Sequence, residues 1–146
     1  MMDAPEAQFL KPILVVRIHG KAGSAYAEIL HLDHKGQEHY VGRLDYYKEG
    51  QFTRLDMKPT LREALSDGIT RVVVDLEHVT WFDSTALAEL VEWYHMLGKV
   101  DGKLVIAHPS SKILNVFEVT KLDSVFPVFS TMHDAQEHLK KKSAGI

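Results

Sequence analysis

The sequence predicts an α/β fold built on one largely parallel β-sheet. From residue 57 onward the patterns alternate in the order α-β-α-β-α-β-α, an order typical of parallel strands joined by right-handed crossovers. Residues 13–44 place strand-like stretches before this alternation, and these predict a mixed or antiparallel portion at one side of the sheet. The chain has 146 residues, of which 45% are apolar and 25% charged, as expected for one globular domain.

The N-terminal region is expected to supply strands. Residues 12–18 (PILVVRI) are mostly apolar and predict a buried strand. Residues 26–32 and 38–44 flank the polar sequence DHKG at 33–36, whose glycine suits a positive φ, so they predict a β-hairpin. Residues 26–32 also fit a short helix, because AYAEIL contains good helix formers; strand is the interpretation that we prefer. Residues 45–56 match no element clearly.

The central elements follow from helical periodicity and from glycine stops. Residues 57–66 predict a helix that Gly68 ends, with Pro59 in its first turn, where proline is tolerated. Residues 71–76 contain three consecutive valines and predict a buried strand. A helix over 84–97 follows, because apolar residues recur there at spacings of three and four: Leu87, Leu90, Val91, Tyr94 and Leu97.

The C-terminal third continues the alternation. Residues 103–107 predict a strand, and residues 112–119 predict a helix that begins after two serines. Residues 125–129 predict a short strand, and Pro127 within it favours an edge position because proline lacks the amide hydrogen. Residues 132–142 predict a last helix whose basic C-terminal residues suit the helix dipole.

The most informative motif is Asp83-Ser84-Thr85, which lies where the helical periodicity begins. Side-chain oxygens at a helix N-terminus can accept hydrogen bonds from unpaired backbone N–H groups. A hydroxyl there also lies where the helix dipole favours an added phosphate, so the motif has the outline of a phosphorylation switch. Taken alone, the three residues favour plain helix capping, since all three types are ordinary capping residues.

Composition and charge exclude several classes of function. The net charge of −3 and the pI near 6.3 argue against a nucleic-acid surface and against an anionic membrane. The nine histidines are scattered without the spacing of a metal site, and the absence of cysteine excludes disulfides and thiolate ligands. The sequence contains neither a signal-peptide pattern nor an apolar run long enough to span a membrane. We therefore expect a cytoplasmic protein without metal.

The sequence also lacks the common signatures of enzymes. It contains no phosphate-binding GxxxxGK[ST], no GxGxxG and no GxSxG. Asp75 ends a predicted strand, but no second polar residue is spaced to form a catalytic pair with it, and the acidic pair of a response-regulator receiver is missing. We therefore expect no catalytic residues, no enzymatic activity and no cofactor.

With these elements in order, the chain resembles the STAS domain, the family of bacterial anti-sigma factor antagonists and of the cytoplasmic tails of sulphate transporters. The segment VVVDLEHVTWFDSTALAEL at 72–90 is similar to the family's strand, loop and Asp-Ser-Ser/Thr-Gly-Leu sequence, with Ala86 in place of the glycine. The other similar segments are residues 102–107, residues 113–122, residues 125–129, and Asp134 with Ala135.

The resemblance covers about residues 53–140 and implies a single STAS-like α/β sandwich. Its mixed sheet should have about five to six strands with helices mainly on one face. Residues 1–146 then form one domain, in which residues 1–52 contribute extra N-terminal strands to the same sheet, because they are too few to bury a core alone.

The resemblance also implies a function. In antagonist members, the serine after the aspartate is phosphorylated by a partner anti-sigma factor that is a serine kinase, and a phosphatase reverses this. The unphosphorylated antagonist binds the anti-sigma factor and frees the sigma factor. Ser84 is therefore the expected phosphorylation site, and Asp83 and Thr85 are expected partner contacts.

The aromatic residues near this motif are further candidates for partner binding. Trp81 and Phe82 precede the motif, and aromatic side chains are enriched at interface hot spots, although a place in the core is favoured for at least one of the two. On the predicted helix, Tyr94 shares the face of Leu87 and Leu90, so we expect Trp93 to point elsewhere and to mark a partner patch.

Two other functions fit the same residues. The chain could be a STAS module of another regulatory or transport assembly that acts without phosphorylation. It could also be a small-ligand-binding or hydrolytic α/β domain whose site uses Asp83 and Ser84.

Overall fold

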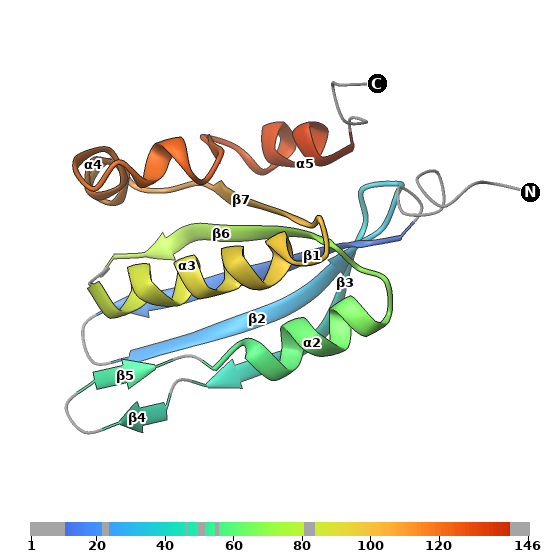
Figure 1. The fold of residues 1–146 in the computed structure, drawn as a ribbon, viewed down its shortest axis with the longest axis horizontal. Helices are drawn as coiled ribbons and strands as arrows, with labels where there is room; N and C mark the ends of the chain where they lie inside the picture. The colour runs from blue at the N-terminus through green and yellow to red at the C-terminus, as the bar shows by residue number, and fades with distance from the viewer. Residues whose placement is uncertain are drawn as a thin grey trace, which may run out of the picture.

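The structure is a computed structural model that describes residues 11–21, 24–45, 47–49, 52–54, 56–80 and 84–140. Its centre is a six-stranded sheet in the order β3-β2-β1-β6-β7-β8 (Figure 1). The strands are β1 (Ile13–Lys21), β2 (Ser24–Leu32), β3 (Glu38–Asp45), β6 (Arg71–Val79), β7 (Lys103–Ala107) and β8 (Val128–Phe129). The first three strands are antiparallel neighbours, whereas β1, β6, β7 and β8 are parallel, so the sheet is mixed as the sequence predicts.

Helices cover the two faces of the sheet unequally, which confirms the predicted α/β sandwich. The helices are α2 (Lys58–Ser66), α3 (Ser84–Gly98), α4 (Ser111–Val119) and α5 (Met132–Lys140), with a 3₁₀ turn at Leu122–Ser124. Buried residues of α2, α3 and α4 join the larger core on one face, whereas α5 packs alone on the opposite face, through Ala135 and Leu139. Because α5 is short, the described helices leave part of this second face uncovered.

The central strands are apolar on both faces because both faces are covered there. Val72, Val73 and Val74 are buried, and they alternate between the core beneath α2 and α3 and the core beneath α5. Strand β1 repeats this alternation from Ile13 to Val16. A strand that is buried on both sides reads as a continuous apolar run, and this explains why the sequence identifies these two strands clearly.

Two predicted strands change their bounds for reasons that the structure shows. Strand β6 runs to Val79 rather than residue 76, because it stays paired with β1 through a register shift between Arg17 and His19. The predicted strand at 125–129 shrinks to Val128–Phe129, because Phe126 turns back to donate its N–H to Leu122. The short strand does lie at the sheet edge.

The predicted hairpin is confirmed, and residues 45–56 contain a smaller one. Strands β2 and β3 pair from Leu32 and Glu38 at the turn to Tyr26 and Asp45 at the far end. Within residues 45–56, β4 (Tyr47–Glu49) and β5 (Phe52–Arg54) form a separate two-stranded sheet. Across the described ranges, the structure has no helix long and apolar enough to cross a membrane.

The turn between β2 and β3 is organised by Asp33. Its carboxylate accepts the N–H groups of Lys35 and Gln37 at 2.9 Å and contacts Nε2 of His39 at 2.8 Å. The hydrogen bond to His39 and, next, that to the Gln37 N–H lower the pKa of Asp33 from 3.8 to about 2. Gly36 completes the turn with a φ of 85°, a conformation that glycine adopts without strain.

This arrangement predicts a pH dependence for the turn. Since the pKa of Asp33 is lower in the folded protein, its contribution to stability is complete above pH 3.8 and is lost as the pH falls toward 2. We expect His39→Ala to raise the Asp33 pKa toward 3.8 in an NMR titration of the carboxyl carbon. The variant His34→Ala, which removes the neighbouring imidazole of the same turn, should leave that pKa unchanged. An unchanged pKa in His39→Ala would contradict this account.

Candidate functional site

The candidate site lies at the end of the sheet where β6 leads into α3. After Val79, the backbone N–H and the hydroxyl of Thr80 both reach the Gly20 carbonyl, at 2.7 and 3.1 Å. These two hydrogen bonds fix the start of the loop against the end of β1. Helix α3 then begins at Ser84, as predicted from the apolar periodicity. Trp81, Phe82 and Asp83 lie outside the described residues.

Ser84 is exposed at the first turn of this 15-residue helix, whereas the following Thr85 is half-buried. The first turn of α3 contains no acidic residue. The positive end of the helix dipole therefore favours an added anion there, and the first turn itself contributes no competing carboxylate. The hydroxyl of Ser84 is accessible to another protein.

The loop after β7 lies at the same end of the sheet, because β6 and β7 are parallel neighbours. His108 adopts a φ of 57° and donates its N–H to the Phe129 carbonyl, and this turns the chain out of the strand. Ser110 then caps α4 by accepting the N–H of Ile113 at 3.3 Å. The role of Ser110 is therefore structural, as the N-cap of α4.

The interpretation of Trp93 as an exposed partner residue is wrong. Trp93 is 2% exposed and packs in the larger core, whereas Tyr94 is 37% exposed and places its ring 5.5 Å from the buried ring of Phe126. The buried stripe of α3 consists of Glu89, Leu90, Trp93 and Leu97. The predicted face contained Leu90 and Leu97 correctly but took Tyr94 in place of Trp93, and Tyr94 instead lies at the half-exposed margin of the helix.

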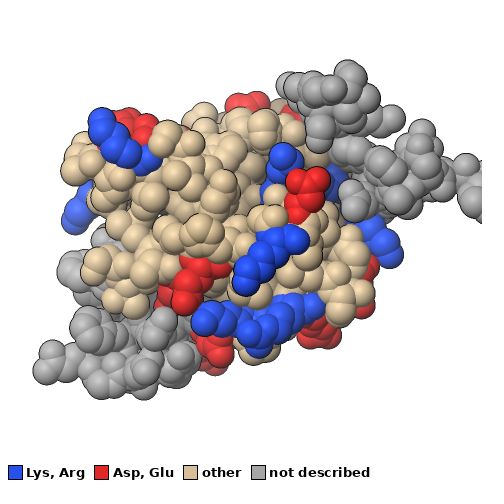
Figure 2. All heavy atoms as spheres, viewed as in Figure 1, with Lys and Arg blue, Asp and Glu red and all other residues tan. Residues whose placement is uncertain are grey.

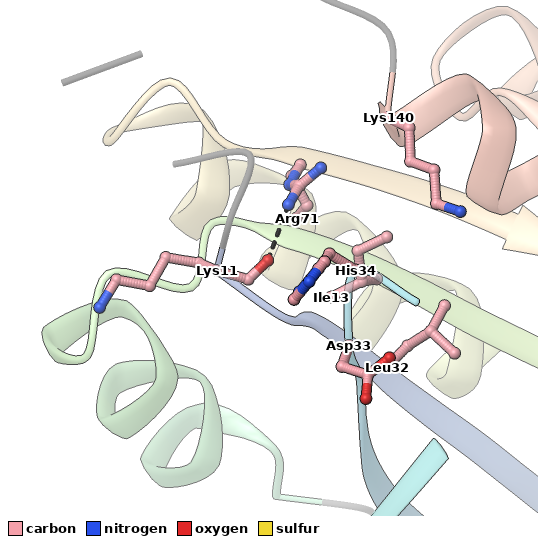
Figure 3. A pocket seen from close by; sticks show the side chains of 7 residues that line it. All are labelled: Lys11, Ile13, Leu32, Asp33, His34, Arg71 and Lys140. Carbon is pink, nitrogen blue, oxygen red and sulfur yellow. Dashed lines mark hydrogen bonds between the residues drawn. The ribbon is translucent and has the colours of Figure 1, made fainter. Parts of the chain in front are cut away.

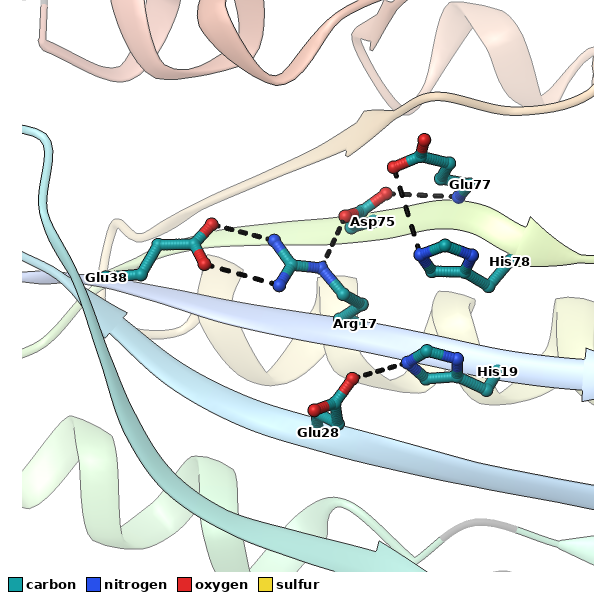
Figure 4. Close-up of polar contacts among 7 residues, drawn as sticks. All are labelled: Arg17, His19, Glu28, Glu38, Asp75, Glu77 and His78. Carbon is teal, nitrogen blue, oxygen red and sulfur yellow. Dashed lines mark hydrogen bonds and ion pairs between the residues drawn. The ribbon is translucent and has the colours of Figure 1, made fainter.

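The open part of the second sheet face carries a polar cluster that the sequence reasoning missed (Figure 4). Arg17 on β1 is its centre, with Nε 2.8 Å from the buried carboxylate of Asp75 on β6 and Nη2 2.8 Å from Glu38 on β3. The hydrogen bonds and charges of Glu38 and Asp75 raise the pKa of Arg17, although burial acts in the opposite direction. The second oxygen of Asp75 accepts the N–H of Glu77.

Four planar side chains stack across four strands beside this cluster. The His19 ring lies between those of Tyr26 and His78, at centroid distances of 4.4 and 4.6 Å, and its Nε2 contacts Glu28. The Arg43 guanidinium covers the other side of Tyr26 at 3.9 Å. Since the rings of His19 and Tyr26 are covered on both sides, neither offers an open face for stacking bases.

The alternation of residue types on β1 shows where the polar part of this face begins. Ile13, Val15, Arg17 and His19 all point to one face of β1, and the row changes from apolar to polar where α5 stops covering it. In the described part of the chain, no three histidine or acidic side chains are arranged to hold a metal ion. The cluster therefore has a structural role: its side-chain contacts link β3, β2, β1 and β6.

A cavity of about 200 Å³ lies at the opposite end of the sheet from Ser84 (Figure 3). Its lining includes Lys11, Arg71 and Lys140. The guanidinium of Arg71 is largely buried, which lowers its pKa, and it donates to the carbonyls of Leu139 and Lys11 at 2.9 and 2.8 Å. Arg71 thus ties the C-terminal turn of α5 to the start of β1, a structural role that accounts for its burial.

Comparison with known proteins shows which family the chain is similar to. A family model described as the STAS domain matches residues 4–135. An anti-sigma-B factor antagonist of Staphylococcus aureus is 32% identical over 87 residues, which cover 60% of this chain and 76% of that protein. A second relative, from Thermotoga maritima, is also named an anti-sigma factor antagonist. It is 25% identical over 80 residues, which cover 55% of this chain and 71% of that protein.

The solved structures agree with the fold. A crystal structure of an anti-sigma factor antagonist from Thermotoga maritima superposes with a TM-score of 0.53 and 18% sequence identity, covering 67% of this chain and 95% of that one. At this level of identity, the likeness concerns the fold alone.

Proposed function

Because the chain belongs to the STAS domain family, we propose that it is a regulatory protein-binding module of the anti-sigma factor antagonist type, switched by phosphorylation of Ser84. Its partner is an anti-sigma factor with serine kinase activity, a phosphatase restores the free serine, and all three act in the cytoplasm. Asp83, Thr85 and Trp81 flank Ser84 in the sequence and belong to the same contact. The chain itself catalyses no reaction in this proposal.

The observation that carries the proposal is the exposed hydroxyl of Ser84 at the first turn of α3. A phosphate there would add about −1.5 to −2 charges. The positive end of the helix dipole favours that phosphate within this protein. A partner that packs on the uncharged residues next to Ser84, such as Leu87 and Ala88, would have to bury the new charge, and the complex would weaken.

The proposal predicts opposite behaviour for two substitutions. With the cognate kinase and ATP, mass spectrometry should find one phosphate, on Ser84 and not on the half-buried Thr85. Ser84→Asp should weaken partner binding by about 1–3 kcal/mol, or roughly fivefold to 150-fold, because it places a charge in the contact. Ser84→Ala should bind constitutively.

Isothermal titration calorimetry of the two variants and the wild type against the purified anti-sigma factor gives these affinities. Equal affinities for all three proteins would contradict the switch and would favour a STAS module that acts without phosphorylation.

A further inference from the structure

The outer surface of α3 is unusual for a helix that faces solvent, because it is almost free of charge. Its 15 residues include no lysine or arginine, and its only acids are Glu89 and Glu92. Glu89 is 6% exposed, and Glu92 lies 3.5 Å from Lys58 on the neighbouring α2. Exposed helix faces usually carry charged residues, whereas on α3 the one exposed charge is Glu92, whose side chain is 45% exposed at the margin toward α2.

The uncharged residues form one continuous row that begins at the proposed phosphorylation site. Counting by three and four from Ser84 reaches each member of what we call the α3 stripe: Leu87, Ala88, Val91, Tyr94 and His95. Ala88, Tyr94 and His95 are exposed, and Leu87 and Val91 are half-buried. Figure 2 shows a broad area without Lys, Arg, Asp or Glu over α3 and toward α4.

The far end of the α3 stripe opens into a hollow of about 480 Å³. Tyr94 and His95 form one side of this hollow, and Lys99, Asp101 and Lys103 stand at its border. Tyr94 is held in place by edge contacts with Phe126 at 5.5 Å and with His95 at 5.8 Å. The surface thus combines an apolar centre, an ordered aromatic side chain and a polar border, which is the composition of a protein–protein interface.

We propose that the partner of Ser84 also binds along the whole α3 stripe, with an apolar row of side chains that ends in an acidic group at the hollow. This inference rests on the proposed function and extends its contact from the first turn of α3 to its last. Two lysines against one aspartate at the border make an acidic side chain the complementary group. The apolar row of the partner replaces the solvent that Leu87, Ala88 and Val91 contact in the free protein.

Ala88→Glu tests the α3 stripe with a substitution that suits an exposed helix position. In the full chain with Ser84 unphosphorylated, we expect this variant to bind the purified anti-sigma factor kinase about tenfold more weakly or worse. The control His133→Glu places the same charge on the exposed start of α5, on the opposite face of the sheet. It should bind within about twofold of the wild type.

A chemical measurement tests the same contact without substitutions in the α3 stripe. Diethyl pyrocarbonate modifies exposed imidazoles, and both His95 and His133 are exposed in the free protein. In the complex, the modification of His95 should slow severalfold, whereas that of His133 should not change.

The outcomes separate this inference from the proposed function. If Ser84→Asp weakens binding but Ala88→Glu and the modification of His95 do not differ from their controls, the contact ends at Ser84 and the inference is overturned. If Ser84→Asp and Ser84→Ala bind alike while Ala88→Glu still loses affinity, the switch fails and the extended contact stands. A change in oligomeric state by light scattering in Ala88→Glu, with unchanged partner affinity, assigns the stripe to a second copy and overturns the inference.

Discussion

Replacing Arg17 with alanine is expected to lower the free energy of unfolding by about 3–5 kcal/mol, because it leaves a buried carboxylate without its cation. Asp75 is 1% exposed, and Arg17 Nε contacts it at 2.8 Å. The loss should appear as a lower urea midpoint with an unchanged dependence on urea concentration.

A matched control is available on the same face of the sheet. Arg43 contacts Asp45 at 2.9 Å, but Asp45 is 71% exposed, so Arg43→Ala should cost about 1 kcal/mol or less. The double variant Arg17→Met with Asp75→Leu removes both charges and should recover most of the stability that Arg17→Ala loses. Equal unfolding free energies for Arg17→Ala and Arg43→Ala would refute this account.

The sequence predicts the strands of this cluster but not the cluster itself. Strands β1 and β6 are evident from their apolar runs, and the polar positions 17, 19, 26 and 28 are visible as an alternation. The contact between Arg17 and Asp75 joins residues 58 positions apart. It depends on the parallel register of β1 and β6 and on a shift in that register after Arg17, and neither is encoded locally.

For helix α3, the sequence does not decide which face is buried, because two rows of apolar residues satisfy the same spacing rule. One row includes Leu87, Val91 and Tyr94, and the other includes Leu90, Trp93 and Leu97. Glu89 lies one turn before Trp93, and a charged residue ordinarily marks the solvent face. In the structure Glu89 is buried with Trp93, so this local rule would also have placed Trp93 on the solvent face. The exposure of Ser84 was predictable, since a helix start at a strand end faces solvent.

The different positions of these two rows predict a second large effect on stability, which separates Trp93 from its neighbour Tyr94. Trp93→Ala should lower the free energy of unfolding by about 3–5 kcal/mol, because it leaves a large cavity between α3 and the sheet. Tyr94→Ala should cost about 1 kcal/mol or less in stability, since the side chain is partly in solvent. The same Tyr94→Ala variant should lose affinity for the partner, because Tyr94 belongs to the α3 stripe.

If Trp93→Ala does not fold, the variant Trp93→Phe tests the same two predictions, for stability and for partner affinity. Phenylalanine fills most of the same space, so the variant should remain folded with reduced stability. Its affinity for the anti-sigma factor kinase should equal that of the wild type, because a core side chain acts on binding only through the fold. If Trp93→Phe instead bound the partner more weakly at an unchanged urea midpoint, Trp93 would itself contact the partner, and the two rows of α3 would have to exchange their roles.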